Sequence, residues 1–196
     1  MMKHLLNSYL LSFSGGIITT LNNIVMKKQM RGYSCNHYYE IVRDCVQGMH
    51  QRRLQTGAVN QATATLVNAN VISMNFPDFE SLYDEVNRLI GHIRGIGPLT
   101  VYDAALKLGC SMNPRLFPVD YVYLMADAPY NAACRLYGRK LNRIEPVSSF
   151  KSMFGEVPSM FIEDFFCVMH RFILQNGKIM KVTTKHIKKE LTKYIL

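Results

Sequence analysis

The chain has 196 residues, of which 48% are apolar, and a formal net charge of +9 at pH 7. This length and composition suffice for a buried core, which excludes a protein that is disordered throughout. No run approaches the roughly eighteen continuous apolar residues of a membrane-spanning helix. The charge lies at the ends: residues 1–39 hold four Lys or Arg and no acid, 178–196 hold six lysines and one glutamate, and 40–177 hold thirteen of each sign. We therefore expect a cytoplasmic protein that does not contact membranes.

The cysteines and histidines show no metal-binding spacing. There is no Cys-x-x-Cys pair and no His-x-x-x-His pair, and the number of cysteines is odd. Zinc sites and iron–sulfur clusters need closely spaced ligands, so we expect neither a metal nor a cofactor. Reduced, buried thiols in a cytosolic protein are the simplest interpretation of the cysteines, which are Cys35, Cys45, Cys110, Cys134 and Cys167.

The first part of the chain predicts short helices. Residues 1–36 form an N-terminal helical extension, and the sequence leaves open whether it belongs to the folded unit. A helix is predicted from His37 to Leu54 by its one-sided apolar pattern, with Gly57 as its end. The small and polar residues 58–69 favour another helix with a thin apolar stripe, although an exposed loop is equally compatible.

Residues 78–109 carry the strongest local pattern in the chain. Asp78 has the position and chemistry of a helix N-cap. The apolar residues that follow it recur at helical spacing and define one buried face: Leu82, Val86, Leu89, Ile90 and Ile93. A second helix begins at Pro98, which is tolerated in a first turn, and Gly109 is expected to close it. The sequence therefore predicts two helices joined by a tight turn.

The turn between these helices contains two glycines separated by one isoleucine. Gly95 and Gly97 allow backbone angles that other residues adopt only with strain. A turn of this kind directs free backbone N–H groups toward one point at the positive end of the second helix. Such a point suits an anion, and a nucleic-acid phosphate is a common one.

The segment Ile93–Gly109 resembles the helix-hairpin-helix motif. The match rests on Gly95, Ile96, Gly97 and Thr100, with Val101 in place of the usual alanine. The resemblance implies a phosphate contact to DNA that does not read the base sequence. By that resemblance, the DNA-binding residues are Arg94, Gly95, Ile96, Gly97, Leu99, Thr100 and Lys107. The alternative is an ordinary helix pair joined by a glycine turn.

A Pro-Val-Asp sequence follows the hairpin, as in DNA glycosylases of the helix-hairpin-helix superfamily. The resemblance implies that Asp120 stabilises the positively charged sugar as the damaged base departs. Bifunctional members carry a lysine where this chain has Leu99, so the implied activity is that of a monofunctional base-excision enzyme in DNA repair. The alternative role for Asp120 is that of a helix N-terminal partner, and whether the protein is an enzyme stays open.

The remaining sequence also favours helices. A short helix is expected over 119–127, and a second one from Pro129 to Tyr137, ended by Gly138. Residues 139–157 have the least regular pattern, with a short helical piece near Phe150, and are expected to be the most mobile. A local basic group lies around the start of this region and is diluted by Glu145; its members are Arg135, Arg139, Lys140 and Arg143.

A strongly apolar helix is predicted from Pro158 to Gln175. Apolar residues from Phe161 to Ile173 cover most of its circumference, so it either lies at the centre of a core or mediates a homo-oligomer or another protein contact. His170 is expected to be packed with a local hydrogen bond. Residues 178–196 predict a short strand and a basic helix.

Together these patterns predict a mainly α-helical protein. The expected organisation is an extension over 1–36, a single helical core domain over 37–177 with the helix-hairpin-helix at 78–109, and a basic C-terminal segment over 178–196. The predicted function is DNA binding without strong sequence preference. The alternatives are a monofunctional DNA glycosylase that uses Asp120, and a structural or protein-interaction module that does not bind nucleic acid.

Overall fold

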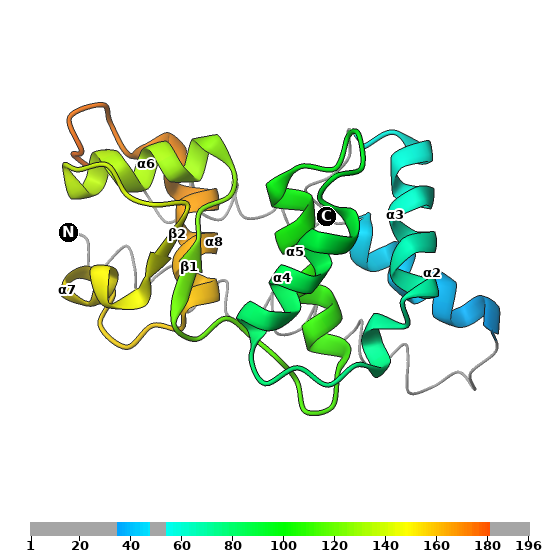
Figure 1. The fold of residues 1–196 in the computed structure, drawn as a ribbon. Coiled ribbons are helices and arrows are strands. Elements are labelled where there is room, and N and C mark those ends of the chain that lie inside the picture. Colours follow the sequence, from blue (N-terminus) through cyan, green and yellow to red (C-terminus); the bar gives the residue numbers. More distant parts are fainter. Residues whose placement is uncertain (1–34, 48–53, 181–196) are drawn as a thin grey trace. The chain divides into compact units, whose positions relative to one another are not determined.

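The computed structural model describes residues 35–47 and 54–180 (Figure 1). The described chain is mainly helical, which confirms the predicted fold class. Where one core domain over 37–177 was expected, the chain divides between Pro118 and Val119 into two compact units. We call the described residues up to Pro118 the hairpin unit and residues 119–180 the aromatic unit. The elements predicted within 1–34 and 181–196 lie outside the described residues.

The hairpin unit is a cluster of short helices. Helix α4 packs against α5, and α2 packs against both α3 and α5. The predicted apolar face of α4 is buried except for the half-buried Leu89, and the facing side of α5 is buried as well. The elements are α2 (Cys35–Val46), α3 (Thr56–Asn68), the 3₁₀ turn η1 (Val71–Ser73), α4 (Phe79–Ile90) and α5 (Pro98–Ser111).

The start of α4 is as the sequence predicts. The Asp78 side chain accepts hydrogen bonds from the amide of Ser81 at 2.8 Å and from its hydroxyl at 2.6 Å. These bonds stabilise the carboxylate and hold the pKa of Asp78 below its ordinary value. A capped helix start of this kind fixes where α4 begins and hence where it delivers the turn to α5.

Two predicted helix ends are wrong, and each involves a glycine. Gly57 lies inside the first turn of α3, which begins at Thr56, so the exposed-loop alternative for 58–69 is excluded. Gly109 does not close α5 but lies buried within it. Its carbonyl accepts the Leu116 amide at 3.0 Å, and a Cβ atom at Gly109 would lie 2.4 Å from the Leu116 carbonyl oxygen. The glycine is needed because the returning chain passes directly over it.

The aromatic unit combines short helices with a small two-stranded sheet. The elements are β1 (Tyr121–Tyr123), α6 (Asp127–Tyr137), β2 (Ile144–Pro146), η2 (Val147–Phe150), α7 (Lys151–Phe154), α8 (Ser159–Met169) and η3 (His170–Phe172). The predicted helix over 119–127 is wrong. Its Tyr-Val-Tyr segment pairs as β1 with β2 in antiparallel register, Val122 opposite Glu145, as aromatic and β-branched residues favour strands. Helix α6 ends at Gly138, as predicted, with a φ of 64°.

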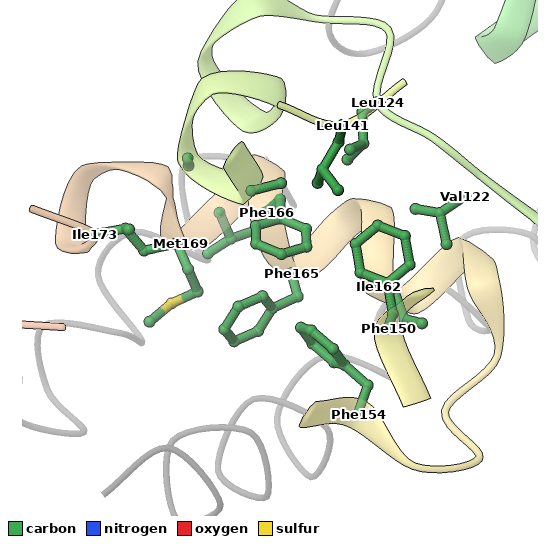
Figure 2. Close-up of a cluster of buried hydrophobic side chains, with 13 residues drawn as sticks. Val122, Leu124, Leu141, Phe150, Phe154, Ile162, Phe165, Phe166, Met169 and Ile173 are labelled. Atoms are coloured by element: carbon green, nitrogen blue, oxygen red, sulfur yellow. The ribbon is translucent and has the colours of Figure 1, made fainter. Parts of the chain in front are cut away.

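A cluster of phenylalanines forms the core of the aromatic unit (Figure 2). Neighbouring rings lie 5.1–6.4 Å apart, mostly edge to face, an arrangement that aromatic rings favour. The cluster comprises Phe150, Phe154, Phe165 and Phe166. Two of these rings come from the region 139–157, so the segment with the least regular sequence contributes directly to the core.

The C-terminal end of the core differs from the long helix predicted over 158–175. Helix α8 ends at Met169, and the chain then turns at Gly177, with a φ of 73°, to form a bridge between Ile173 and Ile179. The Nδ1 of His170 donates to the Cys167 carbonyl at 2.7 Å, which is the local bond expected from the sequence. None of the described helices combines the length and apolar character needed to cross a membrane.

Candidate nucleic-acid interface

The turn between α4 and α5 has two buried isoleucine side chains and three exposed residues. The side chains of Ile93 and Ile96 are 4% and 7% exposed and pack into the hairpin unit. The Ile96 amide donates to the Ile93 carbonyl at 2.9 Å, and Gly95 has a φ of 94°. Arg94, Gly95 and Pro98 are exposed. The two isoleucines therefore anchor the turn, while Gly97 and Leu99 are partly exposed.

The first turn of α5 has backbone donors that no residue of its own helix can satisfy. Gly97 is the N-cap and offers no side chain, and the first bond of the helix runs from the Val101 amide to the Gly97 carbonyl at 3.1 Å. Pro98 has no N–H. Within the described residues, the amides of Gly97 and Leu99 have no acceptor. Thr100 is only 2% exposed, so its hydroxyl does not lie at the surface.

The start of helix α3 also lies beside this turn. The sequence does not predict this neighbour. A Cβ atom at Gly95 would lie 3.4 Å from the Cβ of Ala58, in the first turn of α3. Gln55, the N-cap of α3, makes no side-chain cap, and the first turns of both α3 and α5 lack acidic residues. The positive ends of two uncapped helix dipoles thus meet at one end of the hairpin unit (Figure 1).

The two glycines of the turn have different structural requirements. Gly95 needs glycine because its positive φ would strain any other residue. Gly97 has a φ of −106°, and a Cβ atom there would meet nothing within 4 Å. The fold itself does not require glycine at position 97. A group approaching the turn from outside would benefit from the missing side chain.

The charges near the turn are few. Arg94 is exposed next to it. Lys107, in the third turn of α5, donates to the Asp44 carbonyl near the C-terminal end of α2 at 3.1 Å. A positive charge is favoured there because the helix dipole is negative at that end. Arg88 pairs with Glu85 at 2.6 Å. The described residues of the hairpin unit include five Lys or Arg and seven Asp or Glu.

Asp120 belongs to the aromatic unit, directly before β1. Its side chain is exposed, and its carbonyl accepts the Val147 amide at 2.8 Å. Because β1 replaces the predicted helix, Asp120 does not cap a helix. The hairpin turn belongs to the other unit. A catalytic role for Asp120 stays a prediction.

The basic group of the aromatic unit is occupied by internal contacts. Arg135 donates to the Ile173 carbonyl at 3.2 Å. Arg143 donates to two backbone carbonyls, pairs with Asp127, and stacks 4.1 Å from the centre of the Tyr130 ring. These arginines hold together segments of their own chain and leave little free charge for a partner.

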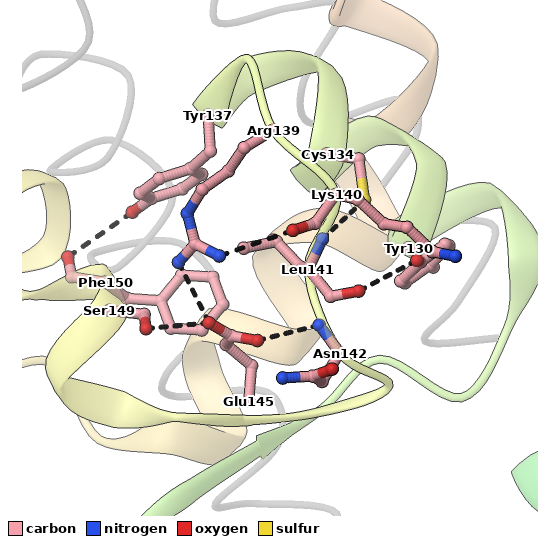
Figure 3. A network of polar contacts seen from close by, with 10 residues as sticks. All are labelled: Tyr130, Cys134, Tyr137, Arg139, Lys140, Leu141, Asn142, Glu145, Ser149 and Phe150. Carbon is pink, nitrogen blue, oxygen red and sulfur yellow. Dashed lines mark hydrogen bonds and ion pairs between the residues drawn. The ribbon is translucent and has the colours of Figure 1, made fainter.

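Glu145 is the buried carboxylate of this group and is 3% exposed. It accepts from the Asn142 amide at 2.7 Å, the Ser149 hydroxyl at 2.8 Å and the Arg139 guanidinium at 2.9 Å (Figure 3). Burial alone would raise the pKa of Glu145, but these three donors outweigh it and hold the pKa below its ordinary value. The carboxylate therefore fixes the loop between α6 and β2.

Comparisons with protein-family models, curated proteins and solved structures give no match to this chain. Among the residues that the structure describes, no three His, Cys, Asp or Glu side chains gather as a metal site. The apolar residues of α8 are mostly buried within the aromatic unit itself. Of the two roles predicted for this helix, the centre of a core or a contact with another protein, the structure therefore shows the first. The case for a function therefore depends on the geometry of the hairpin turn.

Proposed function

We propose that this protein binds DNA through its sugar–phosphate backbone, with the hairpin turn as the phosphate contact and without strong sequence preference. The observation that carries the proposal is the uncapped start of α5, where the amides of Gly97 and Leu99 have no acceptor among the described residues, beside the uncapped start of α3. Backbone N–H groups at a helix N-terminus bind anions through both hydrogen bonds and the helix dipole.

The open glycine supports the same function. A phosphate oxygen must come within about 3 Å of a backbone nitrogen to form a hydrogen bond, and a side chain at Gly97 would stand in its way. Contacts to phosphate position a protein on DNA but carry no base information. The turn offers backbone donors and one exposed arginine, Arg94, which suits backbone binding better than base recognition.

The substitution Gly97→Glu tests the proposal. It places a negative charge at the turn without backbone strain, because the φ of Gly97 suits any residue and a Cβ atom there meets no neighbour. We expect binding to a labelled duplex to weaken by about tenfold or more, which corresponds to about 1.4 kcal/mol. Fluorescence anisotropy titrations of the full chain at two salt concentrations measure this change.

A charge-matched control is Asn75→Glu. Asn75 is exposed and precedes α4, so it lies at the end of that helix away from the turn, about 18 Å along a helix of this length. Its substitution should change duplex affinity less than twofold. Equal losses from both variants would contradict a contact at the turn. If the wild-type chain does not bind duplex at all, the glycine turn serves only to pack two helices, as in a structural or protein-interaction module.

A further inference from the structure

Both helix starts beside the hairpin turn offer backbone donors. The first bond of α3 runs from the Val59 amide to the Gln55 carbonyl at 3.2 Å, and the amides of Thr56 and Gly57 have no acceptor among the described residues. Gly57 is exposed, and a Cβ atom there would meet nothing within 4 Å, as at Gly97. The start of α3 therefore repeats two features of the start of α5: amides without acceptors and an open glycine.

Few cations accompany these donors. The described residues of the hairpin unit include five Lys or Arg and seven Asp or Glu. Arg88 is paired with Glu85, and Lys107 donates to a carbonyl of α2. Arg115 follows the C-terminal end of α5, which lies about 20 Å from the start of a helix of this length. Arg94 is thus the exposed cation adjacent to the turn, and the described unit as a whole gives little long-range attraction for a polyanion.

Internal and terminal phosphates of DNA differ in charge and in surroundings. An internal phosphodiester carries a single negative charge. A terminal phosphate monoester carries about −1.5 to −2 at pH 7 and has three strong acceptor oxygens. The strand also leaves a terminal phosphate on one side only, so fewer neighbouring phosphates approach the carboxylates of the unit. Local amide donors and helix dipoles without a supporting basic surface therefore favour the terminal group.

We propose that the hairpin turn binds the terminal phosphate of a DNA strand in preference to an internal one. This inference rests on the proposed function and names which phosphate the turn contacts. The amides of Gly97 and Leu99 and those at the start of α3 donate to its oxygens, and the positive ends of both helix dipoles stabilise its second charge. The open glycines, Gly57 and Gly97, let the phosphate reach the backbone.

The test compares two duplexes of the same sequence, with an internal fluorescent label, that end in a 5′-phosphate or a 5′-hydroxyl. The full chain should bind the phosphorylated duplex about tenfold more tightly, which corresponds to about 1.4 kcal/mol. A third duplex with a 3′-phosphate in place of the 5′-phosphate identifies which end of the strand the turn prefers, and tighter binding to either phosphorylated end supports the inference.

The variant Gly57→Glu tests the role of the second helix start. The site is exposed and open, and an acidic residue in the first turn stabilises a helix, so unfolding does not account for lost binding. The preference for the phosphorylated duplex should fall below about twofold. The control is Asn68→Glu at the exposed last residue of α3, about 16 Å from Gly57 along the helix. It should keep the full preference.

The outcomes separate this inference from the proposed function. If both duplexes bind equally while Gly97→Glu weakens both, the inference is wrong and the hairpin contact stands. If Gly97→Glu weakens neither, the hairpin contact is wrong and the inference falls with it. A preference that survives both Gly57→Glu and Gly97→Glu would show that the end is bound elsewhere in the chain and overturn the inference. Inorganic phosphate that competes as well as the phosphorylated duplex would overturn it too, because DNA would then add nothing to binding.

Discussion

Replacing Phe166 by alanine is expected to lower the free energy of unfolding by about 3–5 kcal/mol. The Phe166 ring is fully buried and lies 5.5–6.1 Å from the rings of Phe150, Phe154 and Phe165. Its removal leaves a cavity at the point where η2, α7 and α8 meet, and the surrounding rings cannot close it without losing their own contacts. Chemical denaturation followed by circular dichroism gives the change.

The control for this cavity is Leu174→Ala in the same unit. The Leu174 side chain is 42% exposed, so its truncation should cost less than about 1 kcal/mol. A loss at Phe166 no larger than the loss at Leu174 would show that the phenylalanine cluster is not the core that the structure describes.

Substituting Glu145 by glutamine is expected to cost about 2–3 kcal/mol at neutral pH. The glutamine side chain keeps one acceptor oxygen, but its NH₂ group replaces the other. That NH₂ group then faces hydrogen-bond donors that the carboxylate accepted from: the Asn142 amide, the Ser149 hydroxyl and the Arg139 guanidinium. An unsatisfied buried donor costs more than the mean hydrogen bond contributes. Urea denaturation at pH 7 measures the loss.

The pH dependence of this loss follows from the pKa of Glu145, which the fold lowers. A lowered pKa means that the carboxylate stabilises the fold above the pKa of the unfolded chain, near 4.3–4.5, and that this stabilisation disappears as the pH falls through the lower folded value. The difference between wild type and Glu145→Gln should therefore shrink on acidification below about pH 4. Glu156→Gln, at a carboxylate that is 89% exposed, should cost less than about 0.5 kcal/mol at every pH. A difference at position 145 that is independent of pH would contradict the network.

Local chemistry made the helix pair of the hairpin unit predictable from sequence. The cap at Asp78, the one-sided apolar face of α4 and the proline at the start of α5 act within a few residues of one another, so their pattern can be read directly. Gly138 likewise ends α6 through its own positive φ. Each of these signals needs no information about distant parts of the chain.

Other features depend on distant partners and could not be read from the sequence. The role of Gly109 is set by the carbonyl of Leu116 passing over it, and β1 is a strand because β2 pairs with it across α6. Ala58 and Gly95 are almost forty positions apart in the chain, so no local pattern could reveal that a second helix starts beside the turn. The sequence shows Arg135 and Arg143 only as part of a local basic group, because it does not reveal the backbone carbonyls to which they donate.

The central claim is that phosphate meets the backbone N–H groups of the hairpin turn. Amide chemical shifts of the ¹⁵N-labelled full chain, recorded while a short DNA duplex is added, test it most directly. The account predicts large shifts at Gly95, Gly97 and Leu99 and at the start of α3 (Thr56–Ala58), with no change in the capped first turn of α4. Saturating duplex that leaves the amides of 95–99 unmoved, whatever it does elsewhere, would contradict the claim.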